Sequence, residues 1–164
     1  MLYLQPVSLT DGREFYDMLQ RVPPEHGFEN SAYQMEYAEF PAWLEKCVNM
    51  AQGIGLEDWQ VSSGTYWLMD DGVPVAMGRL RHCLTDALRE CGGHIGYAVD
   101  GALQGKGYGK ALLRLLLDEA RRMGIAGEIL VTVNPDNIAS RKVAEANGGE
   151  LRRETEERAY YWFA

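Results

Sequence analysis

Residues 104–110 read QGKGYGK, a glycine-rich run between an apolar segment and a leucine-rich one. A glycine-rich turn between a strand and a helix leaves main-chain N–H groups unpaired at the positive end of the helix dipole. This arrangement binds phosphate or pyrophosphate. The candidate anion ligands are the main-chain amides of Gln104, Gly105, Lys106, Gly107, Tyr108, Gly109 and Lys110.

Two common nucleotide-binding motifs fit this loop poorly. A P-loop needs a glycine where Gln104 stands, and it needs a Ser or Thr for magnesium where Ala111 stands. A G-x-G-x-x-G dinucleotide motif needs one more residue between the last two glycines, and no acidic residue ends the next strand at the required distance. Nucleotide binding therefore remains only a third possibility.

Elements that can position this loop alternate along the chain. Hydrophobic periodicity and breakers predict strands at 2–7, 65–69, 73–81, 93–99, 128–133, 151–154 and 158–163, and helices at 11–21, 40–50, 108–123 and 137–147. Asp71 and Gly72 predict a tight hairpin between the second and third strands, and Pro74 predicts an edge or an irregularity there. Residues 82–92 are interpreted as a polar connection, and Gly96 as a bulge or a close backbone approach.

The helix over 108–123 is the clearest of these elements, because an apolar stripe of leucines runs along one face and Gly124 follows its end. The β-branched run at 128–133 predicts a buried strand parallel to the preceding one.

The loop and its neighbours resemble the GNAT superfamily of N-acetyltransferases. Gln104, Gly107 and Gly109 meet its Q-x-x-G-x-G motif, between the strand HIGYAV and the amphipathic helix. The strand EILVTV and the segment NPDNIASRKVAEANGG, similar to the family's N-x-x-S helix, then follow in order. The resemblance extends over about 94–149, and the chain is also similar to a bacterial subgroup of predicted acetyltransferases.

The resemblance implies an α/β fold with a mixed, twisted central sheet of about six or seven strands and helices on both faces. It implies one domain over residues 1–164 that transfers an acetyl group from acetyl-CoA to a primary amine of a small molecule or peptide by direct attack. A non-catalytic acyl-CoA-binding or regulatory module is the alternative.

The same resemblance assigns cofactor contacts. Amides 104–110 hold the pyrophosphate of acetyl-CoA, and the strand residues Tyr97, Ala98 and Val99 pair with its pantetheine arm. Asn137 and Ser140 match the family's CoA-contacting residues, although Asn137 is equally a natural helix N-cap and Ser140 an ordinary first-turn residue.

Acetyl transfer to an amine needs an oxyanion donor and benefits from a proton donor for the thiolate. In the family the first is a main-chain N–H on the strand before the loop. Many members place a tyrosine donor four residues after the helix serine, where this chain has Ala144. The tyrosines that can substitute are Tyr97, Tyr108, Tyr160 and Tyr161.

The candidate general base is His94, with Glu90 just upstream, because a histidine accepts a proton near neutral pH. A histidine that only packs against the sheet, or a water chain to a glutamate, explains the sequence equally well.

The sequence is compatible with two classes of acceptor substrate, a cationic amine and an acidic molecule. The stretch 25–45 combines glutamates with aromatic residues, which suits a cationic amine such as a polyamine, aminoglycoside or lysine-like group. The same stretch is also explained as a solvated helix face with core aromatics. Arg79 and Arg81 can equally pair with an acidic substrate.

Composition limits the other classes. With 46% hydrophobic residues among 164, we expect one domain, and a formal charge of −8 without a basic stripe argues against nucleic-acid binding. No secretory leader or membrane span is evident, so we expect a cytoplasmic protein without membrane association. A homodimer is possible through the aromatic segment 158–164, which can equally complete the chain's own sheet.

No metal is expected. Three cysteines without a C-x-x-C motif suggest reduced thiols. The nearest approach to a zinc set is His82, Cys83, Cys91 and His94, but adjacent strand residues point to opposite faces, so all four do not readily converge.

Overall fold

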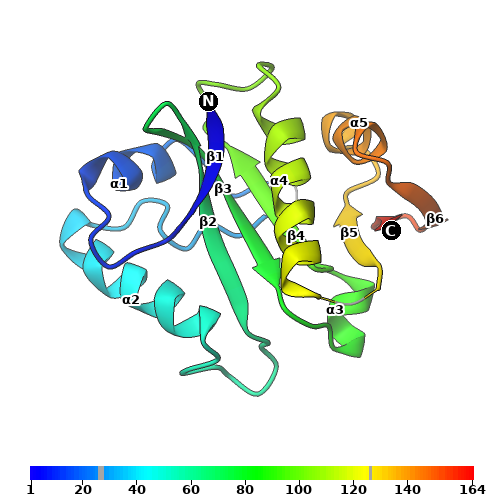
Figure 1. Cartoon of the computed structure of the whole chain (residues 1–164), viewed down its shortest axis with the longest axis horizontal. Coiled ribbons are helices and arrows are strands. Elements are labelled where there is room, and N and C mark those ends of the chain that lie inside the picture. Colours follow the sequence, from blue (N-terminus) through cyan, green and yellow to red (C-terminus); the bar gives the residue numbers. More distant parts are fainter. Residues whose placement is uncertain (26–27, 126) are drawn as a thin grey trace.

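The chain folds around seven strands in two sheets. The structure, a computed structural model, describes residues 1–25, 28–125 and 127–164. The strands are β1 (Leu2–Pro6), β2 (Ser63–Asp70), β3 (Val73–Arg81), β4 (Ile95–Val99), β5 (Ile129–Val133), β6 (Glu150–Glu154) and β7 (Ala159–Phe163). The antiparallel sheets have the orders β1-β2-β3-β4 and β5-β7-β6. Figure 1 shows β4 and β5 at the boundary between them, both running in the same direction.

The β2–β3 hairpin forms as the sequence predicts. Asp71 and Gly72 both have positive φ, 48° and 85°, which is the geometry of a tight two-residue hairpin turn. Pro74 lies opposite a register shift between Leu68 and Met69, as expected for a residue that has no N–H for the ladder.

One face of the first sheet is covered by α1 (Arg13–Leu19), η1 (Tyr37–Glu39) and α2 (Phe40–Ala51). Their apolar side chains form a core with Trp67 and Met77 of the sheet. The first helix is shorter than the predicted 11–21 range because Asp11 has another role. Its carboxylate accepts hydrogen bonds from the Trp67 indole and the Ser8 main chain, both at 2.8 Å, and so stabilises a turn before the helix.

The other face is covered by α4 (Tyr108–Met123), with α5 (Ile138–Ala146) beside it. The buried stripe of α4 contains Leu112, Leu113, Leu116, Leu117 and Ala120, as predicted. A Cβ atom on Gly78 of β3 would lie 2.6 Å from the Leu116 side chain, so the glycine allows α4 to approach the sheet closely. Helices therefore lie on both faces, and the predicted α/β class is confirmed.

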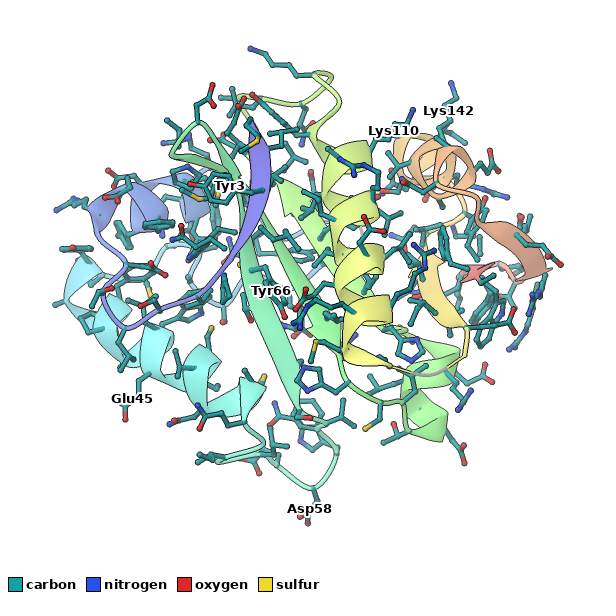
Figure 2. The ribbon with its side chains drawn as sticks, in the orientation of Figure 1. Tyr3, Glu45, Asp58, Tyr66, Lys110 and Lys142 are labelled. Atoms are coloured by element: carbon teal, nitrogen blue, oxygen red, sulfur yellow. The ribbon has the colours of Figure 1, made fainter. Side chains whose placement is uncertain are left out.

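The C-terminal strand β7 pairs with β5 on one side and β6 on the other, so residues 158–163 complete the chain's own second sheet. In Figure 2, polar side chains such as Glu45 and Asp58 project away from the body of the molecule, while the core lies between helices and sheets. No helix in the described ranges is long and apolar enough to cross a membrane.

Three details differ from the sequence predictions. The polar connection 82–92 contains a short helix, α3 (Asp86–Glu90), which buries no side chain and so has no hydrophobic periodicity to detect. The strands form two sheets instead of one continuous sheet. Of the two alternatives for Gly96, the bulge is wrong, since the β3–β4 register is unbroken, whereas the Phe28 ring would lie 3.7 Å from a Cβ there.

Candidate functional site

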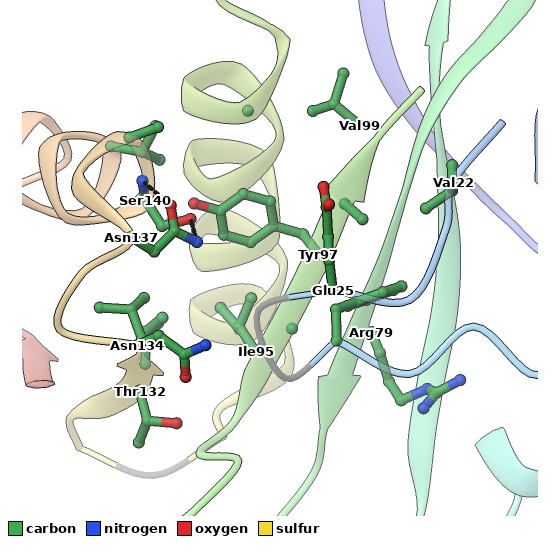
Figure 3. A pocket seen from close by; sticks show the side chains of 18 of the residues that line it. Val22, Glu25, Arg79, Ile95, Tyr97, Val99, Thr132, Asn134, Asn137 and Ser140 are labelled. Carbon is green, nitrogen blue, oxygen red and sulfur yellow. Dashed lines mark hydrogen bonds between the residues drawn. The ribbon is translucent and has the colours of Figure 1, made fainter. Parts of the chain in front are cut away.

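A cavity of about 640 Å³ lies where β4 and β5 separate. Its lining includes residues of the glycine loop, β4, the end of β5 and the start of α5. On the other side of β4 it includes residues of β3 and residues within 22–25 and 28–29. Figure 3 shows β4 in the middle, with Asn137 and Ser140 on one side and Arg79 on the other. The cavity is therefore lined by residues on both sides of β4.

The separation of β4 from β5 begins at a single junction. The main-chain N–H of His94 donates to the Leu130 carbonyl at 2.8 Å, and the Leu130 N–H donates to Nδ1 of His94 at 2.9 Å. Gly93 has φ +64°, and a Cβ there would lie 2.6 Å from the Leu130 carbonyl oxygen. Beyond this junction the strands diverge, which opens the cavity.

One edge of β4 is consequently left open. The ladder with β3 bonds Arg81 to His94 and Asp100 to Val75, and bonded pairs alternate in an antiparallel ladder. The main-chain groups of Tyr97 and Val99 therefore point away from β3, toward the gap. An extended ligand can add to such an edge as a further strand.

The glycine loop is held at its start by Asp100, which is buried and ion-paired with Arg21 at 2.8 Å. Gly105 and Gly107 have φ +80° and +85°, with nothing within 4 Å of a Cβ built on either, so their main chain faces open space. Among the described residues, none accepts a hydrogen bond from the main-chain N–H groups of 104–110. Unpaired donors thus meet the positive end of a 16-residue helix.

Most of the sequence-predicted cofactor residues line this cavity. They are Tyr97, Ala98, Val99, Gln104, Gly105, Gly107, Tyr108, Gly109, Lys110, Asn137 and Ser140. Lys106 lies in the same loop but does not line the cavity. Tyr108 turns its hydroxyl to Asp70, 2.6 Å away.

Asn137 and Ser140 combine a structural role with access to the cavity. Asn137 caps α5, because its side-chain oxygen accepts from the Ser140 N–H at 3.3 Å, and its amide group donates to the Ser140 hydroxyl at 3.0 Å. Both residues line the cavity. Capping therefore fixes their orientation without removing them from a ligand's reach.

Tyr97 points its hydroxyl across the gap toward Ser140 (Figure 3). The oxygen is buried and has no hydrogen-bond partner among the described residues. Burial raises the pKa of Tyr97 to about 12, and Ser140 opposes this shift in part. Ala144, at the position where the family often has tyrosine, is buried in the core and does not line the cavity.

His94 and Glu90 do not reach the cavity. Burial lowers the pKa of His94 to about 4, with smaller contributions from Arg89 and Arg81, and its Nδ1 is already an acceptor for Leu130. Glu90, at the end of α3, forms an exposed ion pair with Arg153 at 3.1 Å. The geometry therefore favours the structural alternative for His94 over the predicted general base, and Glu90 does not line the cavity.

The far side of the cavity carries charges of both signs. Glu25 and Glu29 line it together with Arg79 and Arg81. The aromatic residues of the stretch 25–45 other than Phe28 do not line the cavity. Phe40 and Trp43 are core residues, and Tyr37 stacks on Phe40. Residues 26 and 27 of that stretch lie outside the described residues.

Arg158 is a lining residue that the sequence did not reveal. Its guanidinium donates to the Asn134 side chain at 2.8 Å and to Sγ of Cys91 at 3.1 Å. These contacts join segments far apart in the chain, so no local spacing could indicate them. Tyr160 and Tyr161, also considered as proton donors, bond instead to the Glu90 carbonyl and to Glu145.

The four residues considered for zinc do not converge. His82 bonds to the Ser62 hydroxyl at 2.9 Å, His94 serves the sheet junction, and Cys91 contacts Arg158. Within residues 1–25, 28–125 and 127–164, no three His, Cys, Asp or Glu side chains are grouped as a metal would require.

Comparison with known proteins places the fold. A model of the Acetyltransferase (GNAT) family matches residues 29–148. No curated protein matches the sequence at a significant level.

Solved structures of acetyltransferases superpose over nearly the whole chain. The ribosomal-protein-S5-alanine acetyltransferase from Vibrio fischeri has a TM-score of 0.73 at 15% identity, over 99% of this chain and 92% of that one. RimJ from Mycobacterium smegmatis, in complex with CoA-disulfide, has 0.71 at 20% identity, over 99% and 81%. The aminoglycoside acetyltransferase AAC(6')-Ib, in complex with coenzyme A, has 0.66 at 18% identity, over 100% and 95%. At these identities the likeness concerns the fold.

Proposed function

The chain belongs to the acetyltransferase (GNAT) family, and from that premise we propose that it transfers an acetyl group from acetyl-CoA to the primary amine of a small molecule or peptide. The observation that carries the proposal is the gap between β4 and β5, which is lined by residues on both sides of β4 and has the glycine loop at one end. In this proposal one substrate binds on each side of β4, so that the reacting groups meet beside the strand. We propose that residues 1–164 act as one catalytic domain.

The donor half of the site fits acetyl-CoA. The unpaired amides of 104–110 match a pyrophosphate, and Lys110 adds a positive charge at the same end. The open edge at Tyr97 and Val99 suits the two amides of a pantetheine arm. Asn137 and Ser140 supply side-chain hydrogen bonds from the opposite wall.

The amine nitrogen attacks the thioester carbonyl carbon of acetyl-CoA and forms the C–N bond, which gives a tetrahedral oxyanion. The oxyanion then collapses, the C–S bond breaks, the sulfur leaves as thiolate, and the nitrogen gives its surplus proton to water. A main-chain N–H on the open edge of β4 stabilises the oxyanion, which requires no particular side chain. Tyr97 gives the thiolate its proton, because its hydroxyl lies in the gap without a hydrogen-bond partner among the described residues, and it regains a proton from solvent. Tyr97 thereby takes the role of proton donor, which Ala144 cannot fill because alanine has no ionisable group.

The amine must lose a proton before it attacks. His94 is turned away from the cavity, whereas Glu25 and Glu29 line its acceptor half. We assign proton removal to these glutamates, acting through water. A base that acts through water is sufficient, because the reaction requires only that the amine be neutral.

Thiol release from acetyl-CoA with a panel of amines tests the proposal, with mass spectrometry of the acetylated product. We expect amine-dependent release that Gly107→Glu abolishes. Tight binding of CoA with no release for any amine would contradict catalysis and support the acyl-CoA-binding module.

A further inference from the structure

Arg79 and Arg81 form a pair on the acceptor side of the cavity. They are two residues apart on β3, so their side chains share one face of the sheet, which is the face of Met77 and the α1–α2 core. Gly96 of β4 lies directly opposite Arg79 in the ladder. Both residues line the cavity, and the Phe28 ring lies where a side chain on Gly96 would point.

Neither arginine has a carboxylate within ion-pairing distance among the described residues. The Nε of Arg79 is buried without a hydrogen-bond partner. Arg81 donates one bond, to the Gly93 carbonyl at 3.0 Å. Burial lowers the pKa of Arg81, and the charge of Arg79 lowers it further. A half-buried guanidinium that is not ion-paired favours a ligand with a negative charge, so this pair is suited to a ligand that brings one.

Two acidic residues face the same space. Glu25 and Glu29 line the cavity, and Glu29 lies near enough to Arg81 to act on its charge without forming an ion pair. Figure 3 shows Glu25 and Arg79 coming from separate segments at this end of the cavity. The acceptor half thus carries Arg79 and Arg81 together with Glu25 and Glu29, and Arg158 lines the same cavity beside Cys91.

These charges of both signs discriminate between classes of acceptor. A polycation would have to lie against the arginines, and a dianion would have to lie against the glutamates. An amine with one carboxylate can pair with both the glutamates and the arginines. Its ammonium group would lie near Glu25 or Glu29, and its carboxylate would accept hydrogen bonds from the guanidinium groups of the arginines.

We propose that the acceptor is a zwitterionic amine, an amino acid or a similar small amine with one carboxylate, bound through that carboxylate by Arg79 and Arg81. The inference rests on the proposed acetyl transfer and names the substrate class of the same site.

The test compares the proteinogenic amino acids with their carboxamides. Wild-type protein is assayed for thiol release and, saturated with CoA, for ligand binding by calorimetry. For the preferred side chain, we expect the amino acid to exceed its amide by about 10- to 100-fold in kcat/KM, as for loss of a charge-assisted bidentate contact. Spermidine, kanamycin and phosphoethanolamine serve as polycation and phosphate-bearing comparisons.

The same assays are then repeated with the variant Arg79→Gln. It should bring the ratio of amino acid to amide near one while the Kd for CoA stays unchanged. Arg114→Gln is the matched control, because it removes the same charge from an exposed position on α4 and should keep the ratio.

The outcomes separate the two proposals. Arg79-dependent binding of amino acids without turnover would support the carboxylate site and contradict acetyl transfer. Turnover without a carboxylate preference, or a preference for a polycation or phosphate, would overturn the carboxylate site and leave acetyl transfer standing. Neither binding nor turnover would overturn both.

Discussion

His94 and Leu130 are joined by two hydrogen bonds, one from the His94 main chain and one to the His94 ring. These bonds connect the two sheets where β4 and β5 start to separate. The residue most suggestive of acid–base chemistry in the sequence therefore sets the origin of the gap in which the chemistry is proposed to occur.

His94 should make stability depend on pH. Its pKa is about 4 when folded, against an ordinary value near 6.5, so the unfolded chain binds an extra proton between these values. The contribution is complete above about pH 6.5 and is lost as the pH falls toward 4. His94→Asn keeps an acceptor for Leu130 but does not titrate, so urea unfolding between pH 4.5 and 6.5 should show a shallower pH slope.

His82→Asn is the control, because burial also lowers the pKa of His82 and its contribution must be separated. The kcat/KM of His94→Asn should keep the wild-type pH profile. If this variant, with folding intact, lost the acid limb of the profile, in which kcat/KM rises as a general base loses its proton, His94 would be restored as the general base.

Gly93→Ala should destabilise the junction more than conformational strain alone explains. Gly93 and Gly124 both have positive φ, which costs about 1 kcal/mol for alanine. At Gly124 the new Cβ meets nothing within 4 Å, whereas at Gly93 it meets a carbonyl oxygen. We expect about 1 kcal/mol for Gly124→Ala and about 3 kcal/mol for Gly93→Ala in chemical denaturation. Equal losses would mean that the junction tolerates displacement.

Gly107→Glu should abolish CoA binding measured by calorimetry, because it places bulk and negative charge against the pyrophosphate. Gly107→Ala adds the same backbone strain without the charge, and open space surrounds its Cβ. The alanine variant should therefore retain most of the affinity. Similar Kd values for the glutamate variant and the wild type would refute the assignment of the loop.

Tyr97→Phe should lower kcat by about 10- to 100-fold with the Kd for CoA unchanged, since a thiol is a tolerable leaving group even without a proton donor. Stability should not fall, because the hydroxyl removed is unpaired. Tyr160→Phe removes a hydroxyl bonded to the Glu90 carbonyl and should cost about 1 kcal/mol of stability without changing kcat. A Tyr97→Phe enzyme with full kcat would exclude this residue as the proton donor.

Local signals predicted what local interactions decide. The stripe of α4, the Asp71–Gly72 turn and the glycine loop each depend on residues close in sequence, and the structure contains all three. Family resemblance added Asn137 and Ser140.

Other features depend on contacts between residues far apart in the chain, and local sequence patterns could not predict them. The bond between His94 and Leu130 joins residues 36 positions apart, and it distinguishes a structural histidine from a base. The sequence identifies Arg79 and Arg81 only as charged residues of a strand. The pairing of β3 with β4 shows that Gly96 lies opposite Arg79. The helix α3 buries nothing and therefore has no apolar pattern.

The most direct test of the central claim, that the gap beside β4 binds acetyl-CoA, is a thermal-shift titration with acetyl-CoA, CoA, ATP and NAD. A ligand that binds only the native state raises Tm by mass action, by an amount that grows with its concentration over Kd. We predict a rise with acetyl-CoA and CoA that saturates, and none of comparable size with ATP or NAD. A response to ATP or NAD alone, or no response to acetyl-CoA, would contradict the account.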